Sequence, residues 1–162
     1  MDHMLINVDV VLENLIRKRD KLAGHEAIRT ATVAMGGGSR GVSGEGQLEG
    51  MEAHYCLEHV DIAIGTSTGA LAQGYALAKQ LPVLIKMFCK LCGTGEFIKP
   101  FRRPAVDIDR MVKIMREGDA ALGIPPLDVA AMLASPTEFF VVVTTVDGKT
   151  RVINVKTASD PI

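Results

Sequence analysis

The sequence lacks several features that mark specialised classes of protein. It has no excess of basic charge, because 18 Lys and Arg nearly balance 19 Asp and Glu, and the formal net charge of -1 argues against a nucleic-acid partner. Its three cysteines are too few for a disulfide-stabilised scaffold, so a reducing, cytoplasmic location is the simpler interpretation. The first nine residues carry no basic segment, so we expect no cleaved signal peptide. The longest uncharged run, residues 62–78, is short and partly polar, so we expect no transmembrane helix.

The sequence does contain an alternation of strand-like and helix-like segments, in a length of 162 residues that suits a single core. Periodicity and β-branched runs predict helices over 8–22, 45–58, 70–79, 81–91, 107–116 and 127–133, and strands over 30–35, 61–64, 139–145 and 150–155. Residues 92–104 read as an irregular loop. The last two strands flank Asp147-Gly148, which is typical of a hairpin. We expect an α/β fold: a three-layer sandwich with a mainly parallel central sheet and a C-terminal antiparallel hairpin.

A Gly-x-Ser-x-Gly motif, Gly65-Thr66-Ser67-Thr68-Gly69, lies between a predicted strand and a predicted helix. A sharp strand-to-helix turn of this kind holds the serine hydroxyl exposed, and flanking glycines are needed because side chains would crowd the turn. The N-terminus of the following helix favours a developing oxyanion. The motif therefore indicates a nucleophilic serine, although a simple Ser/Gly-rich turn has the same pattern.

A glycine loop, Gly36 to Gly41 with the sequence Gly-Gly-Gly-Ser-Arg-Gly, follows the first predicted strand. A phosphate-binding Walker loop would need Lys where Val42 stands, so that interpretation is rejected. The glycine spacing satisfies a dinucleotide-binding fingerprint, which also requires an acidic residue at the end of the second strand. Asp61 lies at the beginning of that strand instead, which argues against this interpretation. The third interpretation is that the loop exposes backbone amides near Ser67 as an oxyanion hole.

A serine nucleophile also needs a base. All four histidines precede Ser67, whereas an α/β-hydrolase triad places its histidine last. His54 and His59 fall on a predicted helix as ordinary partly exposed residues. The remaining candidate for the base is a carboxylate that acts directly on the serine in a Ser-Asp dyad.

Together, the Gly-Gly-Gly-x-Arg-Gly loop and the Gly-x-Ser-x-Gly motif resemble those of the patatin-like phospholipase family. The likeness covers residues 30–162, with 1–29 as an N-terminal helical extension, and it includes 31–35 as the first core strand and 61–70 as the elbow. It implies an acyl hydrolase for lipid or other esters, with Ser67 as nucleophile, Gly37 and Gly38 as oxyanion donors, and no metal or cofactor. Arg40 would steer an anionic head group. The remaining motif residues are Gly36, Ser39, Gly41, Gly65, Thr66, Thr68 and Gly69.

The sequence also departs from that family. The family's catalytic Asp lies in an Asp-Gly-Gly or Asp-Gly-Ala motif after the hairpin, so we expect it beyond residue 162 and the domain to be truncated on its C-terminal side. Asp147 is interpreted as a turn residue instead. Glu45 and Gln47 stand where the family's helix is usually apolar. The alternatives are a catalytically incompetent fragment or truncated binding protein and, less favoured, a dinucleotide-binding domain.

Two further features carry weaker signals. Cys89 and Cys92 form a C-x-x-C without a second regularly spaced pair, so we interpret them as buried helix residues rather than metal ligands. Arg102 and Arg103 support a hypothesis of peripheral contact with an anionic membrane surface.

Overall fold

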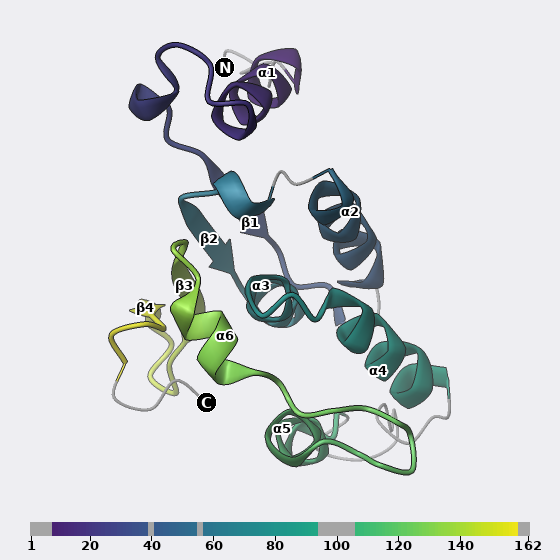
Figure 1. The fold of residues 1–162 in the computed structure, drawn as a ribbon. Coiled ribbons are helices and arrows are strands. Elements are labelled where there is room, and N and C mark those ends of the chain that lie inside the picture. Colours follow the sequence, from purple (N-terminus) through teal and green to yellow (C-terminus); the bar gives the residue numbers. More distant parts are fainter. Residues whose placement is uncertain (1–7, 39–40, 55–56, 94–105, 159–162) are drawn as a thin grey trace.

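The computed structural model describes residues 8–38, 41–54, 57–93 and 106–158 (Figure 1). Its elements follow one another in the order α1 (Val8–Arg19), η1 (His25–Ala27), β1 (Ala31–Ala34), α2 (Gly41–Ala53), η3 (Leu57–His59), β2 (Ile62–Gly65), α3 (Thr68–Leu77), α4 (Leu81–Gly93), α5 (Ile108–Glu117), α6 (Val129–Ala134), β3 (Glu138–Thr144) and β4 (Thr150–Asn154). Within these ranges, no helix is both long and apolar enough to cross a bilayer.

The four strands form one open sheet in the order β1-β2-β3-β4. The pairs β1–β2 and β2–β3 are parallel, and β3–β4 is antiparallel, with Thr144 opposite Thr150. The predicted mainly parallel α/β sheet with a C-terminal hairpin is therefore confirmed. In the hairpin loop the Thr145 N–H donates to the Lys149 carbonyl at 2.8 Å, and Gly148 has a φ of 79°, which glycine adopts easily.

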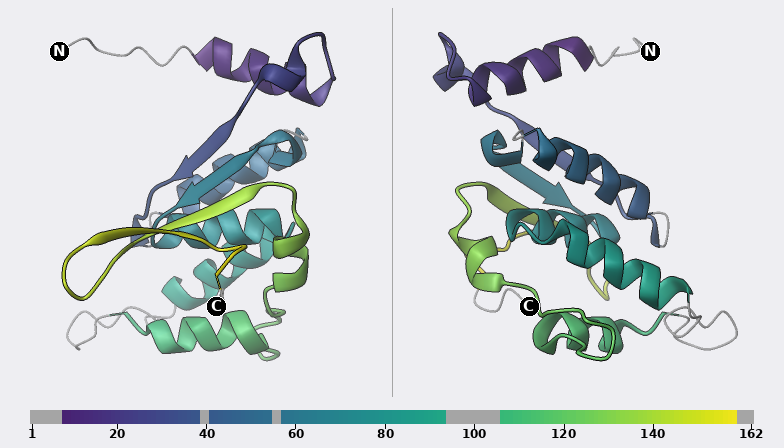
Figure 2. Two further views of the ribbon diagram at one scale, coloured as in Figure 1. Left: turned by 90° about the vertical axis from the view of Figure 1, so that its left-hand side faces the viewer. Right: turned by 45° about the vertical axis from the view of Figure 1, so that its right-hand side comes forward.

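Helices α2, α3, α4 and α6 lie on one face of the sheet. Helix α3 packs against β1, β2 and β3, while α2, α4 and α6 pack around α3. The left panel of Figure 2 shows the strands in front of these helices. The core between the two layers includes Ala63 of β2 and Phe139 of β3, which pair directly, and Tyr75 of α3.

The opposite face of the sheet is apolar and carries no helix from the described residues. Val33, Ile64 and Phe140 are paired across β1, β2 and β3, so their side chains share this face. Val33 is 68% exposed and Val152 of β4 is 63% exposed. The described residues thus form two layers, and the third layer of the expected sandwich stays a prediction.

Helix α1 lies past the beginning of β1, and both an apolar contact of Leu15 with Val60 and a charged cluster join it to the rest of the fold. Asp61 accepts hydrogen bonds from the Lys18 ammonium at 2.5 Å and from the Thr30 N–H at 2.6 Å. Burial opposes ionisation of Asp61, but the bonds from Lys18 and Thr30 outweigh it and lower its pKa. Asp61 is therefore a structural anchor at the beginning of β2.

Three predictions about the helices need correction. Helix α2 spans Gly41–Ala53 rather than 45–58. Its hydrophobic periodicity is weak and it is rich in glycine, so packing against α3 and α4 stabilises it as a helix. Helix α4 continues to Gly93, which removes two residues from the predicted loop; residues 94–104 lie outside the described ranges. Cys89, expected to be buried, is exposed, because the buried face of α4 is made by Leu84, Met87, Phe88 and Leu91.

Candidate active site

Ser67 occupies the sharp turn between β2 and α3. Its backbone has φ 52° and ψ −128°, a left-handed conformation that disfavours every residue except glycine. Ser67 is also the N-cap residue of α3, yet its side chain makes no capping hydrogen bond. A serine at this position normally uses its hydroxyl to cap the helix. Here the exposed hydroxyl is left free of that structural task.

The two glycines of the motif are required by space. A Cβ on Gly69 would lie 2.1 Å from the carbonyl oxygen of Ala34, and a Cβ on Gly65 would lie 2.5 Å from the Cα of Ala70. These distances are far below van der Waals contact, and backbone atoms cannot yield as a flexible side chain would. The turn is thus packed directly onto the end of β1, where the Thr66 N–H donates to Ala34 O at 3.2 Å.

The glycine loop and the elbow meet, as the paired motifs predict. A Cβ on Gly36 would lie 2.6 Å from the Ser67 Cβ, so the start of the loop touches the serine. Gly38 has φ 56°, and α2 begins at Gly41. Ser39 and Arg40, which the resemblance assigns to substrate binding, lie outside the described residues.

The Gly37 amide, expected as an oxyanion donor, already has a partner. Its N–H donates to the Thr68 hydroxyl at 3.0 Å. This bond links the loop to the first residue of α3 and keeps the amide beside the elbow. For Gly37 to stabilise an oxyanion, the Thr68 side chain must rotate away. The N-terminus of α3, which begins beside Ser67, adds its favourable dipole.

The described residues place no carboxylate or imidazole in hydrogen-bond contact with the Ser67 hydroxyl. His59 lies in η3 and Asp61 at the beginning of β2, whereas Ser67 follows the end of that strand. Asp147 lies in the exposed hairpin turn, where it bonds to Lys149 at 2.8 Å and accepts from the Thr145 hydroxyl. Those bonds, Lys149 first, lower the pKa of Asp147. They support its interpretation as a turn residue.

Glu45 is the charged residue whose environment is most unusual. Its side chain is fully buried on α2, and neither carboxylate oxygen has a hydrogen-bond partner. Burial raises its pKa to about 7. In the sequence, Glu45 stands at a helix position that is usually apolar in the patatin-like family that the chain resembles. This departure indicates that the position is unusual, but it does not reveal that the Glu45 side chain is completely buried.

Comparison with known proteins adds no further assignment. No family model matches the chain, and no curated protein and no solved structure matches it. The geometry described above therefore carries the functional argument alone.

Proposed function

We propose that this chain contributes the nucleophile of a serine acyl hydrolase that acts on lipid or other carboxylic esters. The observation that carries the proposal is the strained, exposed Ser67, whose hydroxyl does not cap the helix it begins. Backbone strain of this kind persists only where the surrounding structure enforces it, and it is concentrated at functional sites. The crowded glycines of the elbow provide that enforcement.

The chemistry follows from the positions around Ser67. Its Oγ attacks the ester carbonyl, and the resulting oxyanion is stabilised by Gly38, by Gly37 once Thr68 rotates, and by the N-terminal end of α3. The base of the dyad takes the proton of the Ser67 hydroxyl and passes it to the departing alkoxide, which leaves as the alcohol, and water then hydrolyses the acyl-enzyme to the acid. The base of the proposed Ser-Asp dyad is an aspartate encoded beyond residue 162. A third layer, on the open face of the sheet, is part of the same proposal.

One specific observation favours a second candidate, a binding domain without catalytic activity. Among the described residues, Ser67 has no carboxylate or imidazole partner, so these residues supply no base to it. The dinucleotide alternative loses support, because Asp61 is held by Lys18 and Thr30 at the end of the sheet opposite to the glycine loop.

A fluorophosphonate probe separates these candidates. The 162-residue chain is compared with the same chain extended to an encoded Asp-Gly-Gly or Asp-Gly-Ala motif. We expect labelling of the extended chain, loss of labelling in Ser67→Ala, and retention in Ser43→Ala, a matched exposed serine of α2. Labelling that persists in Ser67→Ala would refute the nucleophile. Esterase turnover by the 162-residue chain, abolished by Ser67→Ala, would instead exclude the binding-domain candidate.

Peripheral contact with anionic membranes is part of the same proposal. Arg102 and Arg103 lie outside the described residues, so the support for membrane contact is their positive charge in the sequence. Reversal of both charges to Glu should reduce co-sedimentation with vesicles that contain anionic lipid. Unchanged co-sedimentation would remove the hypothesis.

A further inference from the structure

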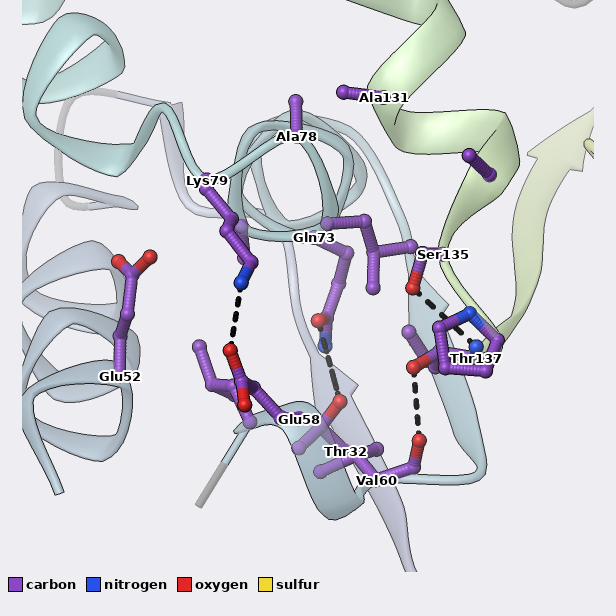
Figure 3. A pocket seen from close by; sticks show the side chains of 16 residues that line it. Thr32, Glu52, Glu58, Val60, Gln73, Ala78, Lys79, Ala131, Ser135 and Thr137 are labelled. Atoms are coloured by element: carbon purple, nitrogen blue, oxygen red, sulfur yellow. Dashed lines mark hydrogen bonds and ion pairs between the residues drawn. The ribbon is translucent and has the colours of Figure 1, made fainter. Parts of the chain in front are cut away.

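A cavity lies at the end of the sheet opposite to Ser67. Its volume is about 760 Å³, within the usual range for small-molecule sites. It is lined near the beginnings of the strands by Thr32, Ala63 and Thr137, and by residues of α3 and α6 (Figure 3). Ser67 follows the other end of β2, so the cavity is separate from the candidate active site.

The cavity exists because the side chains around it are small. Five of its lining residues are alanines, namely Ala63, Ala76, Ala78, Ala131 and Ala134. Protein interiors are normally close-packed, and a Leu at one of these positions would project three further carbon atoms into the space. The wall is therefore apolar and suited to an aliphatic chain.

The deep polar side chains of the cavity are neutral, and their hydrogen bonds are made within the protein. The Thr137 hydroxyl donates to the Val60 carbonyl at 2.8 Å. Gln73, 1% exposed, donates to the Thr32 hydroxyl at 2.9 Å through one of its two amide N–H groups. Figure 3 shows the Gln73 side chain pointing toward Thr32, with the hydrogen bond drawn as a dashed line. The interior thus offers no charged group to a ligand.

The rim, by contrast, is charged and mostly acidic. Lys79, which has a left-handed φ of 58°, places its ammonium 2.6 Å from the Glu58 carboxylate. Glu52 of α2 also lines the cavity. Burial raises the pKa of Glu52; Lys79 lowers it, and repulsion from Glu49 and Glu58 raises it further. Two lining carboxylates, Glu52 and Glu58, therefore face the single ammonium of Lys79, which leaves one negative charge in excess at the rim for an additional cation.

We propose that this cavity binds a single-chain amphiphile with a cationic head group. The aliphatic chain lies among the alanines, and the head group lies beside Glu52, the lining acid that is not paired with Lys79. A fatty carboxylate of the same length is disfavoured, because Glu58 already pairs with the Lys79 ammonium and the remaining charge at the rim, that of Glu52, is negative. The site is independent of the proposed hydrolase, since it shares no residue with the elbow or the glycine loop.

Calorimetry with decyltrimethylammonium, below its micelle concentration, tests the proposal. We expect saturable one-to-one binding. Decanoate should bind at least about tenfold more weakly because its head group has the opposite charge, and tetramethylammonium should not bind measurably because it lacks the chain. Equal binding of decanoate would overturn the cationic assignment. Absence of binding by decyltrimethylammonium would overturn the site.

Substitutions on one helix test the location. Ala131→Leu places a larger side chain in the cavity and should weaken decyltrimethylammonium binding at least about tenfold. Ala130→Leu is the matched control, because Ala130 lies on the same helix, is exposed and does not line the cavity. Circular dichroism and the urea midpoint establish that both variants fold. Equal weakening by both variants, or by neither, would contradict the assigned position.

A second pair of variants tests the charge. Glu52→Gln should weaken binding of the cation roughly two- to fivefold, the range of a partly exposed ion pair, and should lessen the discrimination against decanoate. Glu117→Gln on α5, away from the rim, removes the same charge and should leave both constants unchanged. An equal effect of the two variants would show that net charge, rather than the rim, selects the ligand.

Discussion

Replacing Glu45 by glutamine should remove a large, pH-dependent penalty on folding. Glu45 is 0% exposed and has no hydrogen-bond partner, and burial raises its pKa from 4.5 to about 7. Glutamine has nearly the same shape but no charge to desolvate. The variant therefore isolates the ionisation of this carboxyl from its packing.

The sign follows from the order of the two pKa values. Below pH 4.5 the carboxyl is protonated in both the folded and the unfolded chain, and Glu45 carries no electrostatic penalty. Between 4.5 and about 7 the unfolded chain releases the proton while the folded chain keeps it, so the free energy of unfolding falls as pH rises. Above pH 7 both states are ionised and the loss is complete. A difference of about 2.5 units at about 1.36 kcal/mol each amounts to roughly 3 kcal/mol.

Urea unfolding followed by circular dichroism between pH 4.5 and pH 8 measures this difference. Wild type and Glu45→Gln should have similar stability at pH 4.5, and the variant should be more stable by about 3 kcal/mol at pH 8. Glu49→Gln, an exposed residue of the same helix, should stay within about 0.5 kcal/mol of wild type throughout. Because Glu52 and Asp61 also titrate, the informative quantity is the difference between variants. A difference for Glu45→Gln that does not change with pH would refute the reasoning.

Three further predictions concern stability. Ser67→Gly should stabilise the fold by about 1 kcal/mol by relieving its left-handed backbone while abolishing probe labelling; destabilisation would show that Oγ has a structural role. Gly69→Ala should destabilise the fold by at least about 3 kcal/mol, because the new Cβ would overlap backbone atoms of β1. Gly46→Ala, at an open position of α2, should stabilise the fold by about 0.5–1 kcal/mol, and thermal melts of the two variants compare them. Lys18→Met should destabilise by about 1–2 kcal/mol near pH 7, and the two proteins should converge in acid as Asp61, whose pKa is lowered, becomes protonated; a constant gap would exclude the ion pair as the cause.

The elements predicted best are those fixed by local chemistry. Helix α5 begins after Asp107, whose carboxylate accepts from the Arg110 N–H, and α6 begins after Asp128, which accepts from the Ala131 N–H. The hairpin follows from Asp147-Gly148. The contact between the glycine loop and the elbow was also predictable, because both motifs end parallel strands, and these ends meet at one edge of a sheet.

The features that were not predicted depend on tertiary packing. The sequence shows Glu45 and its position, but only the packing of α2 against α3 and α4 makes its burial complete. The alanine-lined cavity joins residues from β2, α3 and α6, and no local pattern relates Ala63 to Ala131. The hydrogen bond from Gly37 to the Thr68 hydroxyl is likewise visible only once two segments are placed side by side.

Helix α3 connects the two candidate sites, and both of its ends are strained. It begins after Ser67, with φ 52°, and ends just before Lys79, with φ 58°. Glycine would be favoured at both positions by backbone energetics alone. A positive φ does not mark a site by itself, since Lys21 has one in an exposed turn after α1. What distinguishes Ser67 and Lys79 is the use of the side chain that glycine would lack: an uncommitted hydroxyl beside the glycine loop, and an ammonium held over the cavity by Glu58. Because α3 is buried against three strands, it holds these two groups at opposite ends of the sheet, and a ligand at one end need not disturb the other.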